Sequence, residues 1–227
     1  MPTPFSVLFE DNHLLVLAKP SGLATMGVRA GQPSLVSMAK AYLKRKYNKP
    51  GNVYLGVVSR LDAPVTGVVV LARTSKAAAR LNEQFRTGRV TKIYWALVEN
   101  EPDPAQGTCL DHLRKDERHH RMHVTHARHP EAKEARLAYS TLQRLPGATL
   151  VEVRLETGRK HQIRVQLAHR GWPIVGDRKY GANRAFPSGI ALHARLVAFT
   201  HPVRKTLLSL TAPLPPSWRR FGVIKPP

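Results

Sequence analysis

Acidic residues and cysteine are scarce in this sequence, and each shortage narrows the possible functions. The chain of 227 residues carries 15 Asp and Glu against 36 Lys and Arg, which gives a formal charge of +21. An excess this large, spread along the whole chain, indicates a polyanionic partner, and nucleic acid is the usual one. The lone cysteine, Cys109, excludes an internal disulfide, fits a reducing compartment and gives little support to a zinc site.

Long apolar runs are missing as well. No stretch approaches the ~20 apolar residues that a membrane-spanning helix requires, and the N-terminus MPTPFSVLFEDN lacks the order of a signal peptide. An anionic membrane is therefore the weaker alternative as polyanionic partner. We expect a soluble, cytoplasmic protein whose hydrophobic content of 42% suffices for one domain or two closely joined halves.

Strand patterns outnumber helix patterns along the chain. Ser34 and Ser75 are the predicted N-caps of two helices, the second ending at Gly88, and a third helix is predicted over residues 161–169, ended by Gly171. The spacing of the strands is too close for repeated βαβ units, so the class is α+β with a mostly antiparallel mixed sheet in two halves. Strands are predicted at residues 7–9, 14–17, 54–58, 68–71, 93–98, 139–145, 149–155, 192–199 and 207–211.

Residues 114–129, RKDERHHRMHVTHARH, hold five of the eleven histidines together with five Lys or Arg. We predict a solvated basic loop here, with RNA contact as its functional form. A metal site built on four of these histidines is the weaker alternative, because no acid or thiol spacing supports it and the arginines would repel a cation. These four are His119, His120, His123 and His126, and no metal is predicted.

Asp62 is an isolated carboxylate among cations. The previous acid is Asp11 and the next is Glu83, so Asp62 is the only acid from residue 12 to residue 82. It lies in SRLDAPVTG, residues 59–67, which connects two predicted strands. A protein that binds phosphates gains nothing from such a group unless the group has a chemical role.

Two further stretches carry comparable signals. In KIYWALV, residues 92–98, Tyr94 comes early in a strand, where a tyrosine is ordinarily just a good β-former. In TGRKHQIRVQLAHRGWPIVGDRKYGA, residues 157–182, Gly158 permits a tight turn, and Arg159 and Lys160 can meet phosphates near a helix start. Arg164 falls inside that helix, where the simplest expectation is a solvated face.

Together these stretches resemble the RluA family of pseudouridine synthases. The family's HRLD-x-x-[TS]-S-G block is similar to residues 59–67, and its K-x-Y-x-A-L-V block to residues 92–98. Its TGR-x-HQIR and G-D-x-x-Y-G blocks are similar to residues 157–164 and 176–181, and its early K-P-x-G to residues 19–22. The matches follow the family's order and cover nearly the whole chain.

The sequence departs from the family in two places. Ser59 stands where the family usually has His, and Thr66 stands where it usually has Ser. The Arg60–Leu61–Asp62 core and the Gly67 turn remain, so substrate fit is more affected than chemistry. We also expect one catalytic domain over residues 1–227, without the S4-type RNA-binding domain that precedes it in some relatives.

The resemblance implies isomerisation of uridine in RNA to pseudouridine, without a cofactor, in a central cleft of the pseudouridine synthase fold. The N1–C1′ bond breaks, the uracil turns over, and C5 bonds to C1′. By resemblance Asp62 is the catalytic carboxylate, acting as nucleophile or base. Arg164 would be its ionic partner, and Tyr94 would lie over the flipped base and take the C5 proton.

Base flipping costs about a few kcal/mol, and by resemblance Arg60 fills the vacated stack. An ordinary phosphate clamp is the alternative role for Arg60. Arg159 and Lys160 would contact the RNA, which is either ribosomal or transfer RNA. No membrane and no protein partner are implied, and we expect a monomer.

Two functions from other classes compete with this one. A non-catalytic RNA-binding or ribosome-assembly protein would explain the charge equally well, but not the joint presence of Asp62, Tyr94 and Arg164. A glycoside hydrolase ordinarily uses two carboxylates roughly 5 to 9.5 Å apart. Asp62 has no neighbour in the sequence that could serve as the second.

Overall fold

The structure, a computed structural model, describes residues 3–223, which form two compact units with a sheet in each. Unit 1 contains the residues up to Val90 together with Ala194–Pro213. Unit 2 contains Thr91–His193 together with the residues from Leu214 onward. The predicted α+β class and the predicted two sheet-bearing halves are confirmed. No helix of the described chain is long and apolar enough to cross a membrane.

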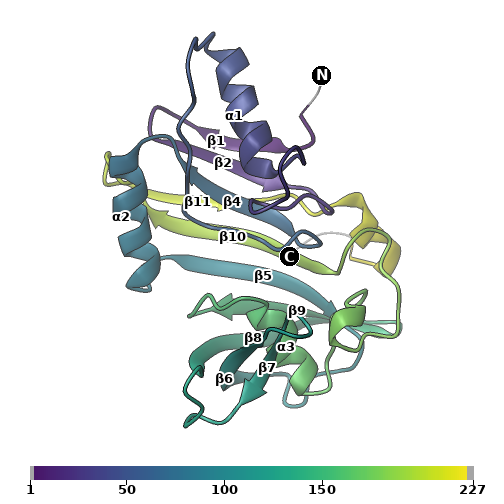
Figure 1. Cartoon of the computed structure of the whole chain (residues 1–227). Helices are drawn as coiled ribbons and strands as arrows, with labels where there is room; N and C mark the ends of the chain where they lie inside the picture. The colour runs from purple at the N-terminus through teal and green to yellow at the C-terminus, as the bar shows by residue number, and fades with distance from the viewer. Residues whose placement is uncertain (1–2, 224–227) are drawn as a thin grey trace. The chain divides into compact units, whose positions relative to one another are not determined.

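The sheet of unit 1 has the strand order β1-β2-β4-β10, with β11 beside β10 and β3 beside β4 (Figure 1). The pairs β1 with β2, β2 with β4, β3 with β4, and β10 with β11 are antiparallel. The strands are β1 (Ser6–Glu10), β2 (Leu14–Lys19), β3 (Gly56–Val57), β4 (Thr66–Ala72), β10 (Leu192–Thr200) and β11 (Leu207–Thr211). The prediction of a strand over residues 54–58 was too long, because only Gly56 and Val57 find partners on β4.

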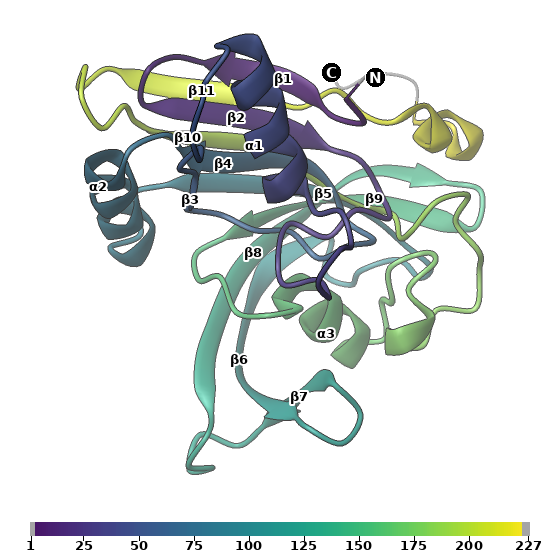
Figure 2. The same ribbon diagram turned by 45° about the horizontal axis from the view of Figure 1, so that its top comes forward.

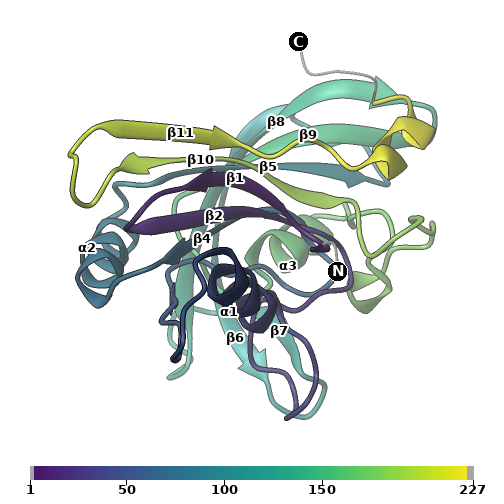
Figure 3. The same cartoon turned by 90° about the horizontal axis from the view of Figure 1, so that it is seen from above.

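Strands β2 and β4 are apolar on both faces, and each face is covered by a different helix. Helix α1 (Leu35–Lys46) lies along one face, visible in Figures 1 and 3, and its Leu35, Ala39 and Leu43 are buried there. Helix α2 (Ser75–Arg86) buries apolar residues in the cluster of the other face. The alternation of side chains along a strand explains the division: Leu15, Leu17, Val69 and Leu71 join the α1 cluster, while Leu14, Val16, Val68 and Val70 join the α2 cluster.

The helix starts show one confirmed cap and one correction. Ser34 caps α1 as predicted, its hydroxyl accepting the N–H of Ser37 at 3.1 Å. The predicted cap Ser75 was wrong, because Thr74 holds the extended cap conformation and accepts the N–H of Ala77 at 3.2 Å. Ser75 is the first helical residue and is exposed.

The sheet of unit 2 is antiparallel, with the order β5-β9-β8-β6-β7 (Figure 2). Its strands are β5 (Thr91–Val98), β6 (Gln106–Asp116), β7 (Arg121–Thr125), β8 (Lys133–Leu145) and β9 (Ala148–Leu155). Helix α3 (Gln162–His169) packs on this sheet, where Val165 meets Leu113 and Met122. Two short 3-10 helices, η1 (Arg178–Tyr180) and η2 (Pro216–Phe221), complete the unit.

The predicted basic loop at residues 114–129 was wrong, because β6 and β7 form a hairpin there (Figure 2). Strands β6 and β7 were not predicted, and β8 begins at Lys133 rather than at residue 139. Met122 and Val124 alternate with outward polar residues and pack with Leu113. The density of charge around them conceals this two-residue period in the sequence.

Candidate active site

Asp62 lies on the loop between β3 and β4 of unit 1, and backbone bonds fix the loop on both sides of it. The N–H of Gly22 donates to the carbonyl of Ala63 at 2.9 Å. The Leu61 N–H donates to the Thr25 hydroxyl at 3.0 Å, and that hydroxyl donates back to the Leu61 carbonyl at 2.8 Å. The half-buried Asp62 is therefore carried by a loop whose backbone is held by hydrogen bonds on both sides of it.

Lys19 ties this loop to the K-P-x-G turn and is almost wholly buried, at 2% exposure. Its ammonium donates to the carbonyls of Pro20 at 2.8 Å, Leu23 at 2.7 Å and Ala63 at 3.1 Å. Burial lowers the pKa of Lys19 to about 8, and the nearby Asp62 charge acts in the opposite direction. No role was predicted for Lys19, although a lysine at the end of an apolar strand was a signal.

Ser59 and Thr66, the two residues that depart from the family pattern, both contribute to the local structure of the loop and β4. The Ser59 hydroxyl accepts the N–H of Val70 at 2.8 Å, so it helps to join the loop to β4. Thr66 is buried at the start of β4. Gly67 has a φ of +117°, and a Cβ there would lie 2.2 Å from the carbonyl oxygen of Ala194. Only glycine fits at that position.

In unit 2, the turn before α3 is closed by a buried side chain, Gln162. Its carbonyl oxygen accepts the Thr157 hydroxyl at 2.8 Å and the Arg159 N–H at 2.9 Å, and its amide donates to Arg136 at 3.0 Å. His161 precedes the helix in the left-handed region, with a φ of 51°. This closed turn leaves Arg159 and Lys160 exposed at the helix start, where they were predicted to meet phosphates.

Arg164 is buried at 5% exposure, so it does not lie on a solvated face of its helix. Its Nε donates to Oδ2 of Asp177 at 2.6 Å and its Nη2 donates to Oδ1 at 2.8 Å. Asp177 is itself buried, and the guanidinium lies over the Tyr180 ring at 5.0 Å. A bidentate pair of this kind fixes both the position and the plane of the guanidinium.

Asp177 and Tyr180 belong to the G-D-x-x-Y-G block, for which no residue role was predicted. The Tyr180 hydroxyl accepts the N–H of Met122 at 2.9 Å and lies 2.8 Å from Nδ1 of His161, to which it can donate. Side chains from two family blocks thus hold Arg164 and the start of α3 in one connected group. The sequence signal for a role of Asp177 was the presence of one acid beside Arg178 and Lys179 in this block.

The remaining predicted residues divide between the units. Arg60 is exposed on the Asp62 loop of unit 1. Tyr94 is half-buried on β5 of unit 2, opposite Val153 of β9. The predicted pair of Asp62 with Arg164 would join the two units and stays a prediction.

In the hairpin of β6 and β7, two histidines contact a carboxylate. Nδ1 of His119 and Nε2 of His123 lie 2.8 and 2.9 Å from the same oxygen of Asp116. Across residues 3–223 no group of three or more His, Cys, Asp or Glu side chains is arranged to hold a metal ion.

Comparison with known proteins places these features in a family. The sequence profile of RNA pseudouridylate synthases matches residues 13–169. Ribosomal large subunit pseudouridine synthase D of Xylella fastidiosa is 37% identical over 226 residues, covering 93% of this chain and 66% of the relative. Ribosomal large subunit pseudouridine synthase C of Buchnera aphidicola is 34% identical, covering 92% of this chain and 66% of the relative.

A solved structure agrees with the sequence matches. Human RNA pseudouridylate synthase domain containing 4 superposes with a TM-score of 0.79 at 28% identity, covering 95% of this chain and 92% of that one. The chain spans about two thirds of the length of the two bacterial relatives. This chain therefore belongs to the RNA pseudouridylate synthase family of enzymes.

Proposed function

We propose that this chain converts uridine in structured RNA to pseudouridine, with Asp62 as the catalytic carboxylate. One observation carries the proposal: the family profile spans Asp62, Tyr94 and Arg164 in one continuous match over residues 13–169. The local structure supports it, because the Asp62 loop is fixed by its backbone and the Arg164 guanidinium is fixed by Asp177. Fixed groups are what catalysis by positioning requires.

The proposed reaction balances without a further reactant. The N1–C1′ bond breaks, the uracil turns over while bound, C5 bonds to C1′, and the proton lost from C5 is matched by one gained at N1. Asp62 acts as nucleophile or base at the sugar or the base. Tyr94 takes the C5 proton once the new bond has formed.

The cations of the proposed site have separate roles. Arg164 keeps Asp62 ionised, because an opposite charge favours the carboxylate form. Arg60 occupies the stack vacated by the flipped uridine and offsets part of the cost of about a few kcal/mol. Arg159 and Lys160 contact phosphates at the exposed start of α3.

The names of the two bacterial relatives favour ribosomal over transfer RNA as the substrate class, with the large ribosomal subunit as the first candidate. Deleting the gene in its host and mapping pseudouridine in total RNA identifies the substrate. We expect one or a few sites to disappear from ribosomal RNA. Loss confined to transfer RNA would reverse this preference.

Replacing the carboxylate tests the activity itself. Asp62→Asn should lower tritium release from 5-tritiated uridine in RNA by at least about a hundredfold, the scale of a lost catalytic group. Affinity for RNA should stay near that of the wild type. Glu83→Gln is the matched control, because Glu83 is a half-exposed carboxylate of the same unit, paired with Arg86 on α2. Retention of a tenth of the wild-type rate by Asp62→Asn would exclude Asp62 as the catalytic group.

The proton-transfer role of Tyr94 predicts a different defect. Tyr94→Phe should bind, flip and attack the uridine but fail to release the C5 proton, so an RNA adduct accumulates. Gel-shift trapping with 5-fluorouridine RNA beside the tritium assay separates the steps. Normal proton release by Tyr94→Phe, or loss of the adduct together with turnover, would assign the C5 proton to another group.

A further inference from the structure

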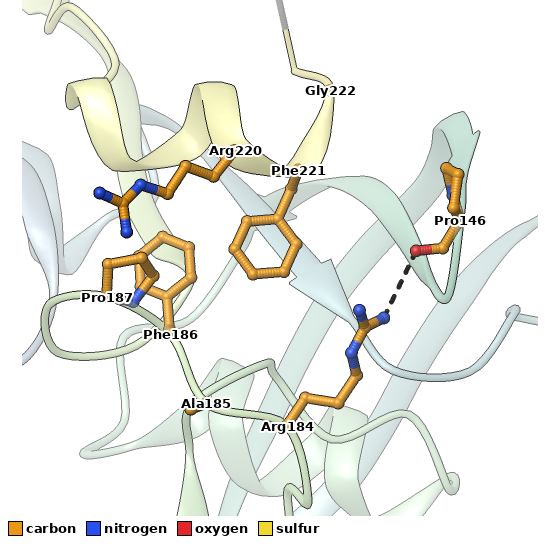
Figure 4. Close-up of a pocket in the computed structure, with 8 residues that line it drawn as sticks. All are labelled: Pro146, Arg184, Ala185, Phe186, Pro187, Arg220, Phe221 and Gly222. Atoms are coloured by element: carbon orange, nitrogen blue, oxygen red, sulfur yellow. Dashed lines mark hydrogen bonds between the residues drawn. The ribbon is translucent and has the colours of Figure 1, made fainter.

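Unit 2 contains a pocket of about 560 Å³ that none of the proposed catalytic residues lines (Figure 4). It lies between η2, the segment of residues 184–187, and the turn that joins β8 to β9. Its volume is in the range of sites that hold small molecules or single nucleotides. Two phenylalanines, two arginines and two prolines dominate its walls: Phe186, Phe221, Arg184, Arg220, Pro146 and Pro187.

The two aromatic rings of the pocket are held in place by packing. The centroids of Phe186 and Phe221 lie 5.5 Å apart with their planes 30° from parallel. The Phe186 ring also forms a T-shaped pair with the almost wholly buried Trp218, with the two ring centroids 5.9 Å apart. Both phenylalanines keep part of their surface exposed. The pocket therefore presents fixed aromatic surface rather than mobile side chains.

The charges around these rings are positive. In Figure 4 the guanidinium groups of Arg184 and Arg220 lie on opposite sides of the phenylalanine pair. The Arg184 guanidinium donates to the carbonyl of Gly147 and lies 5.9 Å from the Phe221 ring centroid. Arg220 is exposed. The nearby carboxylate of Glu99 accepts the backbone N–H groups of Asn183 and Arg184 at 3.0 and 2.6 Å.

The pocket is also tied to the group that holds Arg164. The N–H of Gly176 donates to the carbonyl of Arg184 at 2.9 Å, and Gly176 directly precedes Asp177. A Cβ on Gly176 would lie 2.6 Å from the Cβ of Phe186, so the segment of the pocket packs tightly on this turn. A ligand in the pocket would thus lie on the same rigid part of unit 2 as the Asp177–Arg164 pair.

We propose that this pocket binds one nucleotide of single-stranded RNA flanking the target uridine, a subsite that rests on the proposed function. The base stacks on the Phe186 and Phe221 rings, and the phosphate meets Arg220. Stacking of bases on aromatic side chains beside cations is the general chemistry of single-strand recognition. Such stacking tolerates any base, because every base has an aromatic face. The subsite therefore adds affinity for RNA but no base specificity.

The test measures binding without isomerisation. The probe is a fluorescein-labelled RNA of about 10 nucleotides that contains no uridine, in a length range that such surfaces cover. Fluorescence anisotropy compares the wild type with Arg220→Gln and Phe221→Leu. Arg219→Gln is the matched control, because Arg219 is the exposed neighbour on η2 and does not line the pocket.

We expect Arg220→Gln and Phe221→Leu each to weaken binding by about fivefold or more, and Arg219→Gln by less than about twofold. Arg220→Gln should also reduce the slope of log K against log salt by about 0.7, the value for one lost phosphate contact on a single strand. Equal losses for Arg219→Gln and Arg220→Gln would overturn the proposal, because they indicate a diffuse charge effect.

Two further outcomes are decisive. Phe221→Leu with wild-type affinity and a wild-type melting temperature would overturn the stacking role. Free uridine monophosphate and unlabelled RNA are also compared as competitors of the probe at equal nucleotide concentration. Equal competition by the two would overturn the proposal and assign the pocket to a mononucleotide. Failure of Asp62→Asn to lower turnover would reject the proposed function, while the binding result with uridine-free RNA would stand apart from it.

Discussion

Each unit buries a long cation next to residues of the proposed site, and the two units accommodate the charge differently. In unit 1, Lys19 donates to three backbone carbonyls, and burial lowers its pKa to about 8. In unit 2, Arg164 is held by a carboxylate, Asp177, through two hydrogen bonds of 2.6 and 2.8 Å. Lys19 and Arg164 are the lysine and the arginine that are buried among residues 3–223.

The difference follows from the chemistry of the two side chains. An ammonium is a compact charge that can lose its proton when it is desolvated, and neutral carbonyls can solvate it from several directions. A guanidinium stays charged at every accessible pH, so a buried arginine requires a counter-charge. In unit 1 the Lys19 ammonium is therefore surrounded by neutral carbonyls, with the Asp62 charge nearby, whereas in unit 2 Arg164 depends on an intact ion pair.

Breaking that ion pair gives the largest expected effect. Arg164→Met should lower the free energy of unfolding by about 3–5 kcal/mol, because the Asp177 carboxylate remains buried without its guanidinium. Asp62→Asn should change it by less than about 1 kcal/mol, since asparagine nearly keeps the size of the side chain and the backbone hydrogen bonds of the loop remain. Urea unfolding followed by circular dichroism measures both.

A double variant sharpens the result. Arg164→Met with Asp177→Leu removes both charges and should recover at least half of the lost stability, as replacement of buried pairs by apolar residues often does. A double variant as unstable as Arg164→Met alone would show that packing, not the unpaired carboxylate, explains the loss. Equal destabilisation by Asp62→Asn and Arg164→Met would remove the contrast between the units.

The sequence predicts those features of the two units that depend on the pattern of neighbouring residues. It indicated nine of the strands, the helix starting after Ser34, and the family blocks that contain Asp62, Tyr94 and Arg164. It placed Arg164 on a helix but did not identify Asp177 as its partner, because the fold brings together these two residues, which are 13 positions apart in the sequence. It missed the β6–β7 hairpin, because charged residues there conceal the apolar positions. Lys19 and Asp177 received no role for a related reason, because the fold brings Ala63 to Lys19 and Arg164 to Asp177.

Substitution of a glycine in a family block should give the next largest effect on stability. The effect should be large in the loop of unit 1 and small in the turn of unit 2. Gly67→Ala should cost about 2–4 kcal/mol, since alanine is strained at a φ of +117° and its Cβ would overlap the Ala194 carbonyl oxygen. Gly158→Ala should be nearly neutral, because a Cβ there meets nothing within 4 Å. Thermal melting of both variants provides the measurement. A costly Gly158→Ala would show that the turn before α3 needs more backbone freedom than its conformation indicates.

The smallest expected effect concerns the proton of Lys19. Burial lowers its pKa from the usual 10.5 to about 8 in the folded chain. Between about pH 8 and pH 10.5 the unfolded chain still holds this proton while the folded chain has lost it. The unfolded state then binds more protons, so the contribution of Lys19 to the free energy of unfolding rises with pH across that window. Below about pH 8 both states hold the proton, and the contribution is constant.

The measurement is urea unfolding of wild type and Lys19→Met from about pH 7 to about pH 10.5. The difference in unfolding free energy between them should grow in favour of the wild type by about 1–3 kcal/mol over this range, because methionine carries no titrating group. Asp62→Asn removes the charge that opposes the lowering of the pKa, so in that background the rise should begin at lower pH. A difference that stays constant up to about pH 10 would show that the three carbonyls keep Lys19 protonated, and the two units would then both bury a permanent cation.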